Sequence, residues 1–172
     1  LEGEGHFAAV LCRDKDSVPS GGRVTLATVP KLPAEMESFF QFLDTEGIHY
    51  PFDKKRLLVQ NGYVQYIPEG MPELKGLHIM RSGWFLGELK KKRFEPSGAF
   101  ARGLTPDVCD KVIAYPGDSE EVVRYLKCET LQVNPNLKNG WYLICVDEFA
   151  LGWGKVSNGT LKNKYPSGWR LV

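Results

Sequence analysis

An Asn-Gly pair at positions 61 and 62 is the feature that most constrains the fold of this 172-residue chain. It lies between two runs typical of strands, 56–60 and 63–67. Both central residues of a type I′ turn need a positive φ, which Asn and Gly adopt readily, so we predict a β-hairpin here. A further apolar run at 77–80 predicts a third short strand.

A helix is predicted immediately before the hairpin. Pro33 suits its first turn and Gly47 its end, because glycine readily adopts the left-handed conformation that follows many helices. The apolar residues between them recur at i, i+3, i+4 and i+7: Met36, Phe39, Phe40 and Leu43. One helix beside a small sheet predicts an α+β module over residues 23–82.

The C-terminal part of the chain, residues 83–172, is predicted to form short strands joined by glycine turns. Strand-forming runs occur at 84–89, 141–146, 149–156 and 160–166. Two short helices are predicted, one from Pro106 to Ile113 and one after the capping-box spacing of Asp118 and Glu121. This content predicts a small β-barrel with helices at one side, which we expect to fold independently of residues 23–82.

The first 22 residues differ from the rest. Residues 7–12 predict a short buried strand, and the charged and then Pro/Ser/Gly-rich segment 13–22 predicts a linker. The chain starts at Leu1 and its first methionine is Met36. We therefore expect residues 1–22 to be the last strand of an upstream domain plus a linker, in a chain cut from a larger protein.

Composition places the chain among ordinary globular proteins. Hydrophobic residues make up 42% and charged residues 25% of the sequence, which excludes disordered, fibrous and coiled-coil classes. No apolar run approaches the roughly 20 residues of a membrane helix, so we expect no membrane partner. The four cysteines lack the short paired spacing of zinc ligands, and we expect reduced thiols in a cytoplasmic protein: Cys12, Cys109, Cys128 and Cys145.

The sequence contains no recognisable catalytic or cofactor motif. The three histidines lie in three separate blocks, and no cysteine lies in a basic cluster that would lower its pKa. Gly3-Glu-Gly5 precedes a predicted strand, whereas a nucleotide-binding loop follows a strand and precedes a helix. A P-loop and a nucleophile elbow are also missing from the sequence. We therefore expect no catalytic residue, no metal ligand and no cofactor site in this chain.

Basic residues interleaved with aromatic ones are the strongest functional feature. The formal charge is +1, but residues 1–82 carry 9 Lys or Arg against 11 Asp or Glu, and residues 83–172 carry 13 against 10. Such a mixture suits a phosphate backbone and unstacked bases. The RNA-binding candidates are Lys90, Lys91, Lys92, Arg93, Trp153, Lys155, Lys162, Asn163, Lys164, Tyr165 and Arg170. Lysines that protect exposed strand edges from aggregation are the alternative interpretation.

Several of these segments also resemble a known family. Residues 87–97, 125–131, 151–155 and 161–168 together resemble the PUA-like RNA-binding domain of bacterial RsmF-type methyltransferases, which make 5-methylcytosine in small-subunit ribosomal RNA. Residues 3–11 resemble the closing strand of the family's catalytic domain. The helix-and-hairpin block resembles the small ferredoxin-like domain that the family places between its catalytic and PUA-like parts.

The resemblance implies an α+β chain in which a ferredoxin-like module (23–82) is followed by a PUA-like β-barrel with short helices (83–172). It implies an RNA-binding part of a cytosine-C5 methyltransferase, which binds and orients small-subunit ribosomal RNA for the upstream catalytic domain. S-adenosylmethionine is implied for the full-length enzyme, and no cysteine of this chain matches the family's catalytic ones. The alternative is an interaction module that packs on the catalytic domain or on a ribosomal protein.

Two positions depart from the family's pattern. Gly98 stands where the family tends to have histidine, which would weaken a polar contact with RNA. Cys128 stands where the family tends to have glycine. From that replacement we expect that the backbone at position 128 does not need a conformation that favours glycine.

Overall fold

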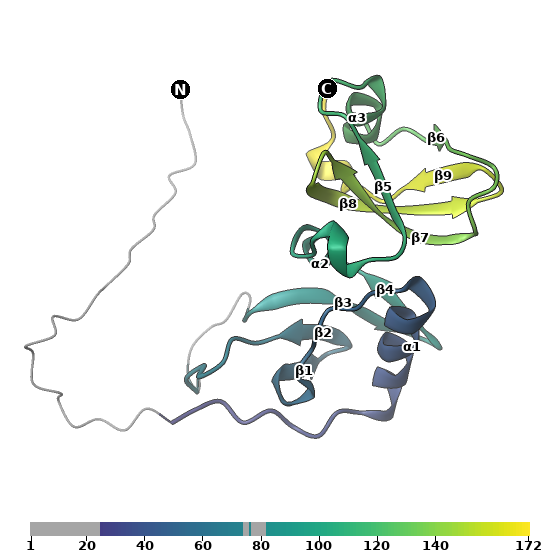
Figure 1. Ribbon diagram of the computed structural model, residues 1–172. Helices are drawn as coiled ribbons and strands as arrows, with labels where there is room; N and C mark the ends of the chain where they lie inside the picture. The colour runs from purple at the N-terminus through teal and green to yellow at the C-terminus, as the bar shows by residue number, and fades with distance from the viewer. Residues whose placement is uncertain (1–24, 74–75, 77–81) are drawn as a thin grey trace, which may run out of the picture.

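The computed structural model describes residues 25–73, 76 and 82–172. Two β-sheets lie one above the other in Figure 1, with a short helix between them. The strands predicted at 7–12 and 77–80 and the linker at 13–22 lie outside the described residues.

The first sheet is an antiparallel meander in the order β1-β2-β3-β4. Its strands are β1 (Leu57–Gln60), β2 (Tyr63–Tyr66), β3 (Trp84–Lys90) and β4 (Arg93–Pro96), and the short 3-10 turn η2 (Lys54–Arg56) precedes β1. The predicted hairpin is confirmed, because Asn61 and Gly62 have φ values of 51° and 80° and join β1 to β2.

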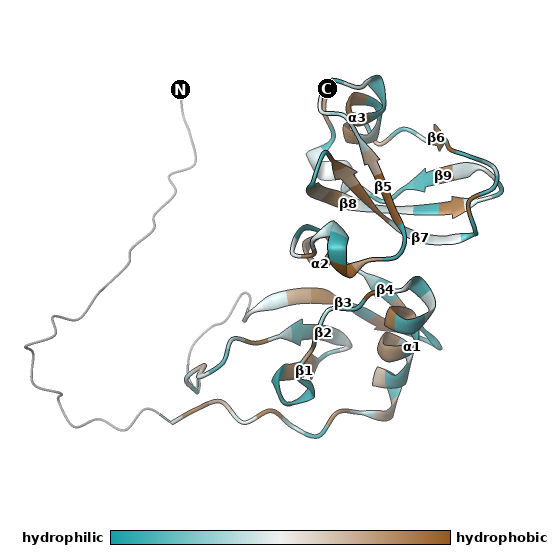
Figure 2. Cartoon of the chain, in the orientation of Figure 1, coloured by the Kyte–Doolittle hydropathy of each residue, from teal (hydrophilic) through white to brown (hydrophobic). Residues whose placement is uncertain are grey.

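One helix, α1 (Glu37–Glu46), packs on this sheet after a 3-10 turn, η1 (Ala34–Met36). It ends at Gly47, whose φ of 67° is left-handed, as predicted. Phe39 and Phe42 are buried against Phe94 of β4, with ring centroids 5.0 and 5.2 Å apart. The helix combines hydrophobic and hydrophilic segments (Figure 2), which leaves a polar face free for other contacts.

Two expectations about this part of the chain need correction. A boundary between residues 82 and 83 would cut through the first sheet, because β3 pairs with β2 across it. The sheet is also not ferredoxin-like, since that fold crosses over through helices between its strands. Here neighbouring strands follow the order of the sequence, and α1 precedes them all. The α+β class itself is confirmed.

The second sheet curls around its own core in the order β5-β7-β8-β9-β6. Its strands are β5 (Val112–Tyr115), β6 (Leu131–Gln132), β7 (Gly140–Val146), β8 (Phe149–Ser157) and β9 (Thr160–Asn163). Helix α3 (Glu120–Leu126) supplies the buried Tyr125 to this core, and the turn η4 (Ser167–Trp169) follows β9. The strands predicted at 141–146 and 149–156 are confirmed.

The two predicted helices of this part have different outcomes. The second is confirmed as α3, although its N-cap is Ser119, whose hydroxyl accepts a hydrogen bond from the Val122 N–H at 3.4 Å. The first predicted helix is wrong, because only a 3-10 turn, η3 (Pro106–Val108), forms there. Val112 and Ile113 lie in β5, because their backbone pairs in parallel with β7.

One aromatic core joins the two sheets. Helix α2 (Gly98–Arg102) lies between them and places Phe100, which is fully buried, 5.6 Å from the Trp153 ring of β8. The Trp153 indole N–H also donates to the Ser97 carbonyl at 2.9 Å. The expectation of two separately folding modules therefore conflicts with a core that both sheets share. No helix of the described ranges has the length and apolar character to cross a membrane.

Candidate nucleic-acid interface

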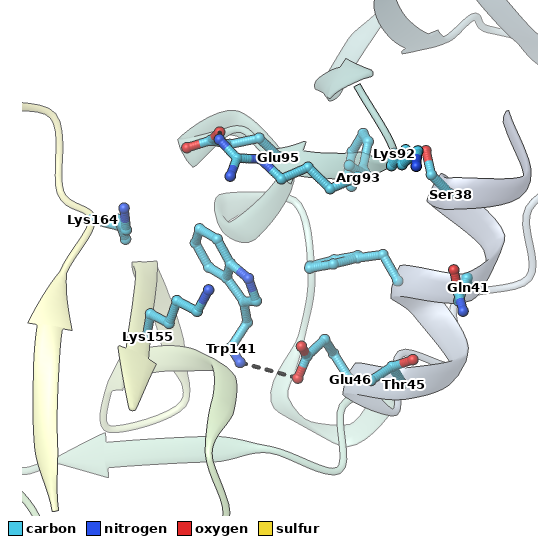
Figure 3. Close-up of a pocket in the computed structure, with 12 residues that line it drawn as sticks. Ser38, Gln41, Thr45, Glu46, Lys92, Arg93, Glu95, Trp141, Lys155 and Lys164 are labelled. Carbon is cyan, nitrogen blue, oxygen red and sulfur yellow. Dashed lines mark hydrogen bonds and ion pairs between the residues drawn. The ribbon is translucent and has the colours of Figure 1, made fainter. Parts of the chain in front are cut away.

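A cleft of about 330 Å³ opens where the two sheets meet, and we call it the junction cleft. Its walls come from α1, from the end of the β3–β4 hairpin, and from β7, β8 and the segment after β9 (Figure 3). The lining residues are Ser38, Gln41, Phe42, Thr45, Glu46, Lys92, Arg93, Phe94, Glu95, Trp141, Lys155 and Lys164. Four predicted basic residues are thus brought together from two distant parts of the chain, the β3–β4 hairpin and the β8–β9 region.

The wall on the second sheet is cationic. Lys155 of β8 is the register partner of Trp141 on β7 and of Lys162 on β9, so the three side chains lie in a row on one face of the sheet. The ammonium groups of Lys155 and Lys164 lie 5.7 and 5.5 Å from the centroid of the Trp141 ring. Both lysines are exposed, and Lys162 is exposed beside the cleft without lining it.

The hairpin between β3 and β4 provides the second group of cations. Lys92, at the turn, has a left-handed φ of 63°, and it and Arg93 line the junction cleft. The Arg93 guanidinium lies 3.4 Å from the Glu95 carboxylate in an exposed ion pair. Lys90 forms an ion pair with Glu88 instead, and neither Lys90 nor Lys91 lines the cleft.

Helix α1 forms a neutral polar wall that the sequence analysis missed. Ser38, Gln41 and Thr45 recur at helical spacing and line the cleft, together with Phe42 and Glu46 of the same helix. The Ser38 hydroxyl donates to the Glu35 carbonyl at 2.8 Å. Their helical spacing was visible in the sequence as the polar side of an amphipathic helix. No pattern in the sequence indicated that this side would lie opposite the lysines of the second sheet.

A buried ion pair fixes the floor of the cleft. Glu46, 9% exposed, accepts hydrogen bonds from the Lys111 ammonium at 2.7 Å and from the Trp141 N–H at 3.0 Å. Lys111 also donates to the Thr45 carbonyl at 3.1 Å. A Cβ on Gly140 would lie 2.6 Å from the Glu46 carboxylate and 2.8 Å from the Lys111 ammonium, so a side chain at this position would displace the ion pair. The contacts hold the Trp141 backbone beside the end of α1.

The structure removes some predicted residues from the candidate interface. Trp153 is only 2% exposed, so its ring has no free face for a base, and its choice as an RNA contact is wrong. The Asn163 amide donates to the Tyr125 and Glu129 carbonyls at 2.7 and 3.1 Å, and its oxygen accepts from the Tyr165 N–H at 2.7 Å. Asn163 therefore holds the backbone after β9 in place.

The last two predicted residues lie away from the junction cleft. Tyr165 is half-buried, with its ring 5.6 Å from that of Tyr125 and 6.4 Å from that of Trp169. Arg170 is exposed after η4. Neither residue lines the junction cleft.

Two of the three described cysteines are poor nucleophiles, and the third has an unusual backbone conformation. Burial raises the pKa of Cys109 to about 12 and that of Cys145 to about 11, so both thiols stay protonated at neutral pH. Cys128 has a left-handed φ of 60°, so the expectation that its backbone avoids a glycine-favouring conformation is wrong. In the part of the chain that the structure describes, no group of His, Cys, Asp and Glu could hold a metal ion.

Comparison with protein families identifies both domains of the structure. Residues 39–104 match the RsmF rRNA methyltransferase first C-terminal domain, and residues 113–171 match the methyltransferase RsmF PUA domain. The chain belongs to the RsmF-type methyltransferases. It carries an RNA-binding C-terminal part of an rRNA methyltransferase, and the PUA-like character of the second sheet is confirmed. The interaction-module alternative is not favoured.

The matched segments agree with the arrangement of the sheets. The RsmF first C-terminal domain contains the first sheet and α2, whereas the RsmF PUA domain contains the second sheet. The segment between the two matches, 105–112, runs from α2 into β5. The junction cleft thus lies between two domains of the same family.

Proposed function

We propose that the junction cleft binds the sugar-phosphate backbone of small-subunit ribosomal RNA and orients it for a catalytic domain elsewhere in the protein. The observation that carries this proposal is the convergence of four cationic side chains on one cleft: Lys92, Arg93, Lys155 and Lys164. Cations that meet from separate segments form a localised positive surface, which phosphates neutralise with release of counterions.

The charge balance of the cleft supports a phosphate ligand. Two acidic residues also line it, but Glu46 is neutralised by Lys111 at 2.7 Å. The Arg93–Glu95 pair is exposed at 3.4 Å, and such surface pairs contribute little energy, so the guanidinium is free to turn to a phosphate. Lys162 extends the positive row along the same sheet face, next to Lys155.

The chemistry proposed for the whole enzyme is methyl transfer to cytosine C5, in the cytoplasm, with S-adenosylmethionine as the methyl donor. The described residues do not fit that donor, because the turns that lead from β4 into α2 and from β5 towards α3 each have one glycine and no G-x-G-x-x-G pattern. The residues of this chain would bind and position RNA, whereas the donor would be bound elsewhere.

The salt dependence of RNA binding tests this function. In the full chain, replacing Lys155 and Lys164 by Ala should weaken binding to a small-subunit ribosomal RNA segment. It should also flatten the slope of log K against log salt by roughly 0.7–0.9 for each lost phosphate contact. The matched control, Lys31→Ala with Lys55→Ala, removes two exposed lysines that do not line the cleft.

Unchanged affinity and slope in the cleft variant would overturn the proposal. Equal losses in the cleft variant and in the control would also overturn it, because they would indicate a general charge effect rather than a site.

A further inference from the structure

We propose that the junction cleft binds a single unstacked nucleotide of a single-stranded RNA segment, with its phosphates on the lysines, its base on the Trp141 ring and the edge of the base towards the polar residues of α1. This inference rests on the RNA binding proposed above and adds the form of the RNA and the orientation of the nucleotide. It also makes the RsmF first C-terminal domain a direct part of RNA recognition, because α1 supplies one wall.

The size of the cleft favours one nucleotide. Its volume of about 330 Å³ lies at the lower end of the range of small-molecule sites, about 300–1,000 Å³. A duplex is far too wide to enter such a space, and its bases are stacked and paired. Bases in loops and single strands can turn outward and enter a protein pocket.

The environment of Trp141 favours an aromatic ligand. Its neighbouring rings, Phe42 and Trp153, form T-shaped pairs with it, at interplanar angles of 73° and 88°, so neither ring is stacked flat on it. The groups within cation–π distance of its ring are the ammonium groups of Lys155 and Lys164. Because these lysines are exposed and have long flexible stems, a base can displace them from the ring while they move to its phosphates.

The two walls of the cleft differ in chemistry, and this difference orients the nucleotide. The wall on the second sheet carries positive charge, which attracts phosphate. The α1 wall carries two hydroxyls and an amide, from Ser38, Thr45 and Gln41, and these groups both donate and accept hydrogen bonds as base edges do. Trp141 lies between the walls in Figure 3, and Glu46 holds its backbone there.

Binding of one short RNA oligomer, single-stranded or annealed to its complement, tests the inference. The full chain should bind the single strand at least about 5-fold more tightly, which is the lower end of what one base stack contributes. Gln41→Ala with Thr45→Val should weaken single-strand binding about 5-fold. Because no phosphate contact is lost, the salt slope should not change. Gln60→Ala, at an exposed position of β1 outside the cleft, is the matched control.

Abasic replacements in the RNA give a second test that leaves the protein unchanged. Removing the base at one position should weaken binding to the wild-type chain, and the same removal should cost less in the α1 variant, because the contacts of the base with α1 are already lost there and only its stack on Trp141 remains. A uniform abasic profile, equal affinity for single strand and duplex, or an unaffected α1 variant would each overturn this inference. The lysine experiment above would still decide the proposed function.

Discussion

Two halves of one sheet face have opposite roles in this molecule. On the outer face of β7 and β8, Leu143 and Trp153 are covered by the aromatic core that α2 joins, and we call this the covered half. Two residues further along β8, the exposed Lys155 lies beside Trp141 in the open half. The same strand geometry thus gives stability where the first domain covers it and a cationic wall where that domain leaves it open.

RNA binding and stability thus depend on the same domain junction. Residues of the RsmF first C-terminal domain bury the covered half through Phe100 and line the cleft beside the open half through α1. A change to the covered half should therefore lower stability across both domains. A change to the open half should lower RNA binding and leave stability unchanged.

The largest expected effect is in the covered half. Phe100→Ala removes a fully buried ring that contacts aromatic residues of both domains, and it should lower the free energy of unfolding by about 3–5 kcal/mol. Because the core is shared, unfolding by guanidinium should remain a single transition. Circular dichroism and tryptophan fluorescence would follow it. Two separate transitions in the wild-type chain would show that the two domains do not share a cooperative core.

The next effect is at the border between the halves. Glu46→Ala leaves the backbone N–H of Trp141 without an acceptor and the partly buried Lys111 ammonium without its carboxylate partner, and should cost about 2–3 kcal/mol. The double variant Glu46→Leu with Lys111→Met should recover much of this loss, because it leaves no unpaired charge. Chemical denaturation measures both. A double variant less stable than Glu46→Ala would contradict the interpretation.

A smaller effect, in the opposite direction, is expected at the end of α3. Cys128 has a left-handed φ of 60° and its thiol donates only a long 3.7 Å contact to the Tyr165 carbonyl. Cys128→Gly should therefore raise the free energy of unfolding by about 0.5–1 kcal/mol. Cys128→Ala keeps the Cβ and is the control. Equal stability of the Gly and Ala variants would show that the backbone conformation costs nothing here.

The smallest effect on stability is expected in the open half. Replacing the exposed Lys162 and Lys164 by Ala should change the free energy of unfolding by less than about 1 kcal/mol. RNA binding should nevertheless weaken, with the log–log salt slope flattened by about one to two units. Filter binding over a salt series would measure it. A large loss of stability would contradict the expectation that the open half contributes little to the free energy of unfolding.

Local signals in the sequence predicted local structure well. The Asn61-Gly62 turn, the end of α1 at Gly47 and the strands β7 and β8 all depend on neighbouring residues, and all are present. The helix predicted from Pro106 to Ile113 is wrong because a distant partner, β7, takes Val112 and Ile113 into a parallel ladder. Backbone pairing between distant segments has no counterpart in local periodicity.

The candidate site was predicted only in part, for the same reason. Lysine clusters indicated the cationic wall, but Trp153 and Trp141 look alike in sequence, since each follows a glycine within a strand. Which indole is buried depends on where α2 packs. Glu46 meets the Trp141 N–H across 95 residues, and no pattern in the sequence connects them. The α1 wall was missed because the domains were expected to be independent.

The shared core also determines the order in which the chain can fold during synthesis. The Trp153 indole, which completes the cluster around Phe100, hydrogen-bonds to Ser97, 56 residues earlier in the chain. At roughly 5–20 residues per second, a ribosome needs about 3–11 s to make that stretch. During this interval the aromatic face of the first domain is complete in sequence but lacks its cover. Nascent chains of this length expose the surface on which chaperones and aggregation compete.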